Sequence, residues 1–253
     1  MESSKAGTTT TQDDDQAPAT APACARRRSP SAPLPVGLDF PAFTARLSWN
    51  AKSVARQLRG GAIVSDESFD EVFPQAVRHI SEVHWTPVEV AVRAARLLAP
   101  TRSSRLLDVG AGAGKFCLVA AAATGAGVCG VERSPYLASV AREAARRMEV
   151  SIDIRDGSFE CEDPSTFDGI YLFNPFTESL YVPGVVPALF EHEESRSQTD
   201  VRRAEEFLLG ARVGARVATF CGFGAPMPKP YERMLREERG GGVLEVWTKM
   251  DAK

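Results

Sequence analysis

Short apolar runs and helix-length amphipathic stretches alternate along the chain from about residue 86 onward. Six of the runs are typical of strands, because they are short and bounded by polar or turn-forming residues: Arg105–Val109, Val128–Glu132, Val150–Arg155, Gly169–Asn174, Arg216–Cys221 and Val243–Lys249. Between them, helical periodicity marks Lys115–Ala123, a stretch opened by Ser134-Pro135, and Asp200–Leu209. This alternation predicts an α/β fold with a doubly wound, mostly parallel sheet and helices on both faces.

Two helices have clear sequence features at their start. After Ser134-Pro135, apolar residues recur at i, i+3, i+4, i+7, i+8 and i+11, which places them on one stripe: Leu137, Val140, Ala141, Ala144, Ala145 and Met148. Earlier, Thr86-Pro87 with Glu89 combines a good N-cap, a proline at the first helical position and an acid three residues after the cap. That combination predicts a capping box and a helix that stops at Pro100.

The first part of the chain has a weaker pattern. Ala42–Leu58 and Phe69–Val83 show partial apolar periodicity on either side of Gly60-Gly61, so two helices are expected there. Residues 1–36 combine several prolines with small and polar residues and almost no large apolar side chain. Such a composition cannot bury enough surface to offset chain entropy, and we expect a disordered tail.

The overall composition narrows the classes of function. With 30 basic and 33 acidic residues and a net charge of −3, the chain has no cationic surplus for a nucleic acid backbone, which argues against that partner. The longest uncharged run, residues 116–131, is too short to cross a membrane. The five cysteines form no C-x-x-C pair and share no ligand spacing with the histidines. We therefore expect a cytoplasmic protein without a metal site.

The candidate chemistry begins where the first strand ends. The sequence LLDVGAGAGK places Gly110, Gly112 and Gly114 at alternate positions between a buried strand and a helix. Glycines there allow a tight turn and let a ligand approach backbone N–H groups. The acid Asp108 precedes the loop, and Glu132 ends the next strand eighteen residues after Gly114, where it can accept hydrogen bonds from ribose hydroxyls.

Two cofactors share this geometry. A nicotinamide dinucleotide loop follows G-x-G-x-x-G and would need Gly or Ala where this chain has Lys115. An acid at Asp108 would repel a pyrophosphate but could pair with a cation. S-adenosylmethionine carries a sulfonium and an ammonium group and no phosphate, so it is the expected cofactor.

On these residues the chain resembles the class I, seven-strand S-adenosylmethionine-dependent methyltransferases, over roughly Thr86 to Lys249. The resemblance implies that LLDVGAGAGKF cradles the methionine part of the cofactor. It implies that Glu132 binds the ribose and that Arg133 lies beside the adenine. In DIRDGSF, Asp156 would face the adenine amino group, with Gly157 next to it. The segment HWTP resembles an entry that some members fold back over the cofactor, which assigns Thr86 to that role.

The resemblance also implies an acceptor site at YLFNPF, the family's fourth motif. The Asn174 amide oxygen and a neighbouring carbonyl could hold an amino group for in-line methyl transfer, with Pro175 and Phe176 beside it. Adenine-amino and glutamine-amide methyltransferases carry two prolines here, and this chain has one. The segment CLVAAAATGAGVCGVERSPYL is also similar to the seven-strand lysine methyltransferases. These likenesses favour an amine-type nitrogen, on a protein side chain or a small molecule.

Three alternatives stay open. The acceptor could be an oxygen or carbon of a small molecule, with His79 or His84 as a base. The protein could bind S-adenosylmethionine without catalysis. Asn174 could simply end a strand as a turn former.

The expected organisation is a tail over 1–36 and one methyltransferase domain over 37–253. Within that domain, 37–100 forms a helical lid or entry segment and 101–253 the cofactor-binding core.

Overall fold

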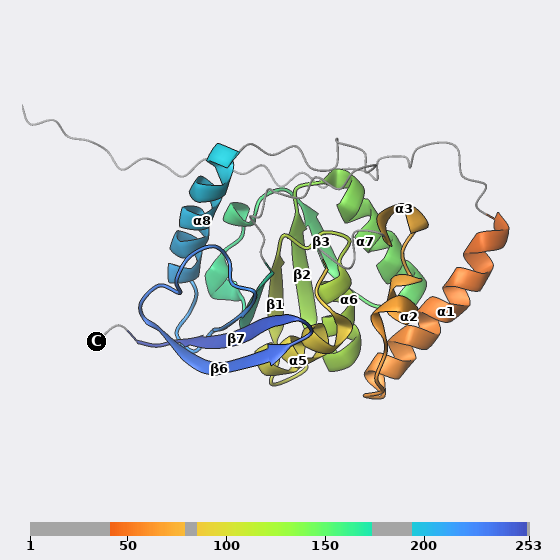
Figure 1. Cartoon of the computed structure of the whole chain (residues 1–253), viewed down its shortest axis with the longest axis horizontal. Helices are drawn as coiled ribbons and strands as arrows, with labels where there is room; N and C mark the ends of the chain where they lie inside the picture. The colour runs from red at the N-terminus through yellow and green to blue at the C-terminus, as the bar shows by residue number, and fades with distance from the viewer. Residues whose placement is uncertain (1–40, 79–84, 174–193, 252–253) are drawn as a thin grey trace, which may run out of the picture.

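A seven-stranded sheet runs through the middle of the molecule (Figure 1). The structure is a computed structural model that describes residues 41–78, 85–173 and 194–251. The strand order is β3-β2-β1-β4-β5-β7-β6. Its strands are β1 (Arg105–Val109), β2 (Gly127–Glu132), β3 (Asp153–Asp156), β4 (Gly169–Phe173), β5 (Arg216–Phe220), β6 (Tyr231–Arg239) and β7 (Gly242–Lys249). Strands β1 to β5 pair in parallel, whereas β7 is antiparallel to both β5 and β6. The expected α/β fold with a mostly parallel sheet is confirmed.

Helices lie on both faces of the sheet. One face is covered by α1 (Pro41–Arg59), α5 (Val88–Leu98), α6 (Lys115–Thr124) and α7 (Pro135–Met148). The other carries α8 (Glu194–Leu209) with the short 3-10 turns η1 (Phe159–Cys161) and η2 (Pro164–Thr166). Figure 1 shows α8 on one side of the sheet and α6, α7 and α1 on the other, with α1 outermost.

The two apolar cores follow the alternation of side chains along each strand. On β1, Leu106 belongs to the core beneath α5, α6 and α7, and Leu107 to the core beneath α8. On β4, Tyr171 likewise belongs to the core beneath α5, α6 and α7, and Ile170 to the core beneath α8. Because successive strand residues point to opposite faces, strands buried on both sides are largely apolar. This explains the continuous apolar runs in the sequence.

Helix α7 forms as its sequence predicts. All six residues of the predicted apolar stripe are buried. The Ser134 side chain accepts a hydrogen bond from the N–H of Leu137, and Pro135 occupies the first turn. Helix α1 likewise confirms the helix expected over Ala42–Leu58.

The single helix expected over Phe69–Val83 is wrong in its described part. The structure has two short helices there, α2 (Asp66–Asp70) and α3 (Gln75–Arg78). Pro74 lies between them, and the chain turns at Phe73, whose N–H donates to the carbonyl of Asp70. Proline has no N–H and clashes with the preceding turn, so it interrupts a helix that apolar periodicity alone would continue. The tail over 1–36 and residues 79–83 lie outside the described residues.

The capping box expected at Thr86 is also wrong. Helix α5 begins one residue later than expected, with Pro87 as N-cap and no side-chain cap bond from it. The Thr86 hydroxyl lies 2.7 Å from the hydroxyl of Tyr171 on β4. The N–H of Val88 donates instead to Oδ1 of Asp66, at 2.9 Å. A tertiary contact has therefore replaced the local cap.

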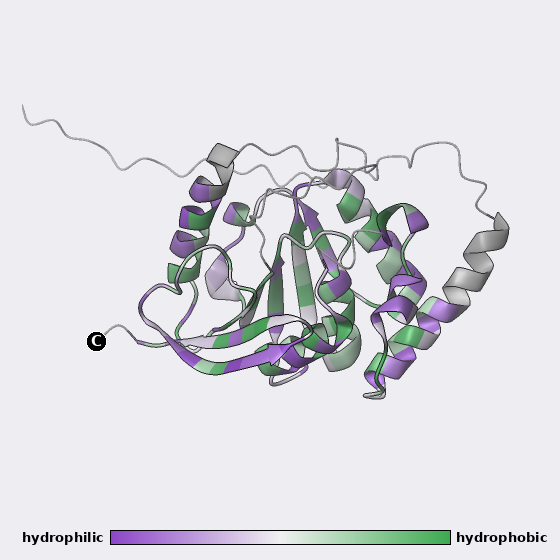
Figure 2. Cartoon of the chain, viewed as in Figure 1, coloured by the Kyte–Doolittle hydropathy of each residue, from purple (hydrophilic) through white to green (hydrophobic). Residues whose placement is uncertain are grey.

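Strand β6 had no counterpart among the six predicted runs. It is an edge strand in which charged residues predominate, with its side chains largely exposed. Figure 2 shows the contrast, since the central strands are mostly hydrophobic and β6 is largely hydrophilic. Only a few residues of this edge strand reach the core, Tyr231 and Leu235 among them, so it lacks a continuous apolar pattern, and its charges oppose pairing with other chains.

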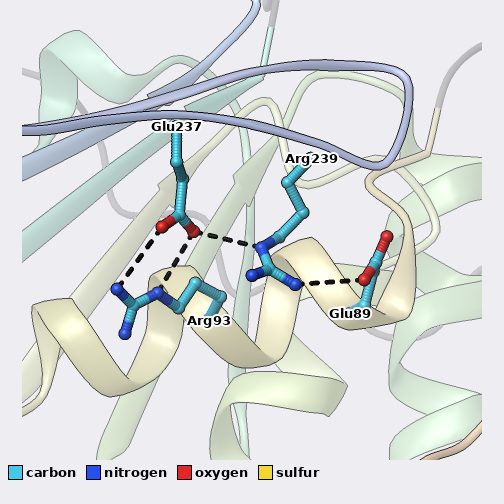
Figure 3. Close-up of polar contacts among 4 residues, drawn as sticks. All are labelled: Glu89, Arg93, Glu237 and Arg239. Atoms are coloured by element: carbon cyan, nitrogen blue, oxygen red, sulfur yellow. Dashed lines mark hydrogen bonds and ion pairs between the residues drawn. The ribbon is translucent and has the colours of Figure 1, made fainter.

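Four charged side chains hold the β6–β7 hairpin against α5 (Figure 3). Glu237 accepts two hydrogen bonds from Arg93, at 3.1 and 3.4 Å, and one from Arg239, at 3.1 Å. Arg239 also donates to Glu89 at 3.1 Å. All four side chains are partly exposed, so each pair contributes no more than about 1 kcal/mol to stability.

Among the described helices, none combines the length and the apolar character needed to cross a membrane.

Candidate functional site

The loop between β1 and α6 follows a path that favours glycine. Gly110, Gly112 and Gly114 have φ values of +76°, +56° and +82°. At Gly114 an added Cβ would lie 2.7 Å from the Cβ of Ala141 on α7, so the loop packs there without room for a side chain. At Gly112 an added Cβ would meet nothing within 4 Å. The loop is thus closely packed where it enters α6 and open at its middle glycine.

Hydrogen bonds fasten this loop to the end of β2. The N–H groups of Gly110 and Ala111 donate to the carbonyl of Val131, at 3.0 and 2.9 Å. The Glu132 carboxylate accepts from the N–H of Gly112 at 2.8 Å and from that of Ser134 at 2.7 Å. The sequence-predicted residues Gly110, Gly112 and Glu132 therefore lie together at the carboxyl ends of β1 and β2.

Burial raises the pKa of Glu132, and the backbone N–H groups of Ser134 and Gly112 oppose that rise. These donors leave its carboxylate ordered in one orientation beside the glycine loop. Such an acid is ready to accept hydrogen bonds from ligand hydroxyls.

Asp108 lies beneath the loop and is buried. Burial is the main reason that the pKa of Asp108 is raised to about 7, and the negative charge of Glu132 adds to the rise. A hydrogen bond from Cys117 partly opposes it. The Cys117 thiol donates to Oδ2 of Asp108 over 3.2 Å. An acid with this pKa is partly protonated near neutral pH, and a nearby cation would favour its charged form.

The end of β3 lies next to Glu132. The N–H of Gly157 donates to the backbone carbonyl of Glu132 at 2.8 Å, and Gly157 has a φ of +133° with nothing within 4 Å of an added Cβ. Its neighbour Asp156 accepts a hydrogen bond from Arg142 at 2.8 Å. The structure thus brings Asp156 and Gly157 to the same edge of the sheet as the glycine loop, again with open space at a glycine.

Two predicted cofactor residues have protein partners that the sequence did not reveal. Arg133 donates to both carboxylate oxygens of Asp200 on α8, at 2.6 and 3.0 Å, which directs its guanidinium toward that helix. Thr86 is buried against Tyr171, whose ring stacks on Phe116 with centroids 3.8 Å apart. Thr86 is therefore anchored to β4 and, through Tyr171, to the first turn of α6.

The predicted acceptor residues Asn174, Pro175 and Phe176 lie outside the described residues, as do His79 and His84. The strand that precedes them, β4, ends at Phe173 and pairs with both β1 and β5. The ring of Phe173 lies 5.1 Å from that of Phe220 at the end of β5.

Sequence reasoning missed a buried ionic cluster next to the glycine loop. The Lys115 ammonium, which is 3% exposed, lies 2.6 Å from Asp66 and 2.7 Å from Asp70, both on α2. No local spacing links these residues, because α2 and α6 are far apart along the chain. The only indication in the sequence was a lysine within a helix whose other residues are apolar or small.

Together these residues fit S-adenosylmethionine. Asp108 suits a ligand that carries positive charge and would repel a pyrophosphate, and Glu132 can accept hydrogen bonds from ribose hydroxyls. Open backbone at Gly112 and Gly157 leaves space for a ligand beside Glu132.

Comparison with known proteins agrees with this interpretation. Residues 106–191 match a protein-family model described as a methyltransferase domain. The match covers β1, the glycine loop and the ends of β2, β3 and β4. It confirms the resemblance to the class I S-adenosylmethionine-dependent methyltransferases. Residues 106–191 accordingly form a methyltransferase domain, and S-adenosylmethionine is the cofactor that fits its glycine loop and Glu132. No curated protein matches the chain.

Many solved structures share the fold. TrmN from Thermus thermophilus is 20% identical, with a TM-score of 0.50, and the match covers 65% of this chain and 49% of TrmN, about half its length. An RNA methyltransferase from Salinibacter ruber, in complex with S-adenosyl-L-homocysteine, is 20% identical over 66% of this chain and 95% of its own, with a TM-score of 0.49. An O-methyltransferase from Thermotoga maritima is 16% identical over 71% and 73%, with a TM-score of 0.45. At these identities the likeness bears on the fold alone.

Proposed function

We propose that this methyltransferase transfers the methyl group to an amine-type nitrogen, on a protein side chain or a small molecule. The observation that supports this proposal is the place of β4 in the sheet. β4 pairs in parallel with β1, and Val109 at the end of β1 is in register with Leu172. The sequence Asn174-Pro175-Phe176 follows Phe173 directly, so the strand that leads to it ends beside the glycine loop.

In this proposal the two ends of the cofactor are bound by different residues. Gly110, Gly112 and Gly114 offer backbone to the methionine part, and Asp108 below them supplies negative charge. Glu132 takes the ribose hydroxyls. Its orientation is already fixed by the N–H groups of Gly112 and Ser134, so no new ordering is needed on binding.

The adenine is assigned to the end of β3. Asp156 faces its amino group, and Gly157 leaves room for the ring. Arg133 lies at the border of this region, where its pairing with Asp200 would hold α8 close to the adenine side. Thr86, which lies just before α5, covers the cofactor on that side.

When bound, S-adenosylmethionine supplies a methyl group on a positively charged sulfur. The Asn174 amide oxygen accepts a hydrogen bond from the neutral amine and directs the nitrogen lone pair at that methyl group. In this transfer the S–C bond would break as the N–C bond forms, the sulfur would keep the electron pair, and the amine would release its proton to solvent. Alignment is the main requirement of such a displacement.

The test is the substitution Asn174→Ala. Affinity for S-adenosyl-L-homocysteine, measured by calorimetry, should stay within about twofold, whereas turnover should fall by about 100-fold or more. Unchanged turnover would remove Asn174 from the mechanism. A turnover that survives Asn174→Ala but is lost on substitution of His79 or His84 would favour an oxygen or carbon acceptor instead.

A further inference from the structure

The ammonium of Lys115 lies among groups from helix α2 and from the segment that precedes α5. It pairs with Asp66 and Asp70 of α2, and it lies 5.7 Å from the ring centroids of both Phe69 and Trp85. Trp85 directly precedes Thr86 at the entrance of α5. Lys115 itself is the first residue of α6, immediately after Gly114 of the glycine loop.

A lysine is electrostatically unfavourable at this position. The amino end of a helix carries partial positive charge, and burial of an ammonium adds a desolvation cost. Helix α6 has no acidic residue in its first turn and no side-chain cap. The carboxylates of Asp66 and Asp70 supply the missing negative charge from α2. The buried Lys115 ammonium is therefore stabilised by the packing of α2 against the start of α6.

Asp66 extends this connection to α5. Its Oδ1 atom accepts a hydrogen bond from the Lys115 ammonium, at 2.6 Å, and another from the N–H of Val88, at 2.9 Å. One carboxylate thus joins the first turn of α5 to the first turn of α6. The entrance of α5 carries Thr86, and the first turn of α6 continues the glycine loop.

We propose that Lys115 is a positioning residue for the cofactor: its pairing with Asp66 and Asp70 sets the glycine loop and the Trp85-Thr86 entrance relative to each other. This inference rests on the assignment of the glycine loop as the cofactor site. Lys115 does not touch the cofactor in this account. It acts through the glycine loop, which ends at Gly114, and through the start of α5, where Asp66 accepts a hydrogen bond from the N–H of Val88.

A positioning role and a purely structural role predict different results for a charge-balanced variant. Lys115→Met leaves two carboxylates without their cation and should lower stability. Adding Asp70→Asn removes most of that imbalance, so the melting temperature of Lys115→Met/Asp70→Asn should recover. If Lys115 sets the loop geometry, cofactor affinity should stay low after this recovery, because the connection to α2 is still missing.

The experiment measures the affinity for S-adenosyl-L-homocysteine by calorimetry, together with the melting temperature. We expect Lys115→Met/Asp70→Asn to bind at least about tenfold more weakly than the wild type, with KM for S-adenosylmethionine raised and kcat little changed. The matched control is Arg93→Met/Glu237→Gln, which breaks an ion pair between α5 and β6 (Figure 3) and should bind like the wild type. Recovery of affinity together with stability would overturn the proposal.

Should Lys115→Met/Asp70→Asn not fold, Asp66→Asn provides the measurement. The Asp66 side chain is 42% exposed, so its replacement is better tolerated. Several-fold weaker binding at an unchanged melting temperature supports the proposal, and unchanged binding overturns it. Failure of the wild type and of the Arg93→Met/Glu237→Gln control to bind would overturn the cofactor assignment, and this inference with it.

Discussion

Asp108 is a buried acid whose position in the sheet lowers folding stability. It lies on the central strand β1 in an interior position where an apolar side chain would be favourable, and its thiol partner Cys117 offsets little of the burial cost. A carboxyl group in such a place is retained at the expense of folding stability. In the proposed function, the positive charge of bound S-adenosylmethionine would offset part of this cost.

The raised pKa of Asp108 predicts a pH dependence of stability. In the unfolded chain the group titrates near 3.8, and in the folded protein its pKa is about 7. Between these values the folded state binds more protons, so the free energy of unfolding should fall as pH rises from about 4 to about 7. The contribution is at most about 4 kcal/mol. Denaturant unfolding at pH 5 and pH 8 measures about 3 kcal/mol of it, because the unfolded group is already ionised at pH 5.

Asp108→Asn should flatten this dependence and make the protein more stable than the wild type at pH 8, while cofactor affinity falls. Asp163→Asn is the matched control, because hydrogen bonds from Ser165 lower the pKa of that exposed acid. Its titration lies below this pH range, so the control should keep the wild-type slope. An Asp108→Asn variant with the wild-type slope would contradict the assigned pKa.

Gly112 gives the sharpest test of the loop at the scale of one residue. Gly112→Arg should reduce affinity for S-adenosyl-L-homocysteine by about 100-fold or more, because the side chain enters the open space beside Glu132. The cost in stability should be only about 1–2 kcal/mol, from the left-handed backbone.

Gly214→Arg is the control for this substitution. Gly214 has a φ of +80°, also has nothing within 4 Å of an added Cβ, and lies before β5 at the opposite edge of the sheet. It should show a similar loss of stability and normal binding. Equal binding by both variants would remove the glycine loop from the cofactor site.

At the scale of elements, the sequence predicts those that have a buried face and misses those fixed by distant partners. The stripe on α7 and the apolar runs of β1, β2 and β4 are local patterns, and their bounds agree with the structure to within a residue or two. The cap of α5 depends on Asp66, and the charged edge strand β6 depends on β7. Neither dependence leaves a pattern within its own segment.

The N-cap of α7 supports a prediction at this scale. Ser134→Ala removes the hydrogen bond from the N–H of Leu137 and should lower the free energy of unfolding by about 1 kcal/mol. Ser139→Ala, within the same helix, should change it by less than about 0.5 kcal/mol, because Ser139 bonds only to the carbonyl of Tyr136 inside the helix. Equal effects of the two substitutions, measured by denaturant unfolding, would show that Ser134 is not a stabilising cap.

At the scale of the whole molecule, the parallel arrangement of the strands brings the candidate site residues to one edge of the sheet. The glycine loop, Glu132 and Gly157 follow β1, β2 and β3, and they meet at one edge because these strands run in the same direction. The sequence contained these residues in the right order, so their meeting at this edge of the sheet was predictable. The Arg133–Asp200 pair and the Lys115 cluster were not, because each joins segments that only the folded sheet brings together.

The central claim is methyl transfer from S-adenosylmethionine to an amine-type nitrogen. The most direct measurement incubates the protein with methyl-labelled S-adenosylmethionine and cell extract separated into protein, nucleic acid and small molecules, and then identifies the labelled atom by mass spectrometry. We expect label on nitrogen in the protein or small-molecule fraction, lost with Asn174→Ala and with Gly112→Arg. Label in the nucleic acid fraction, or on oxygen or carbon, would contradict it.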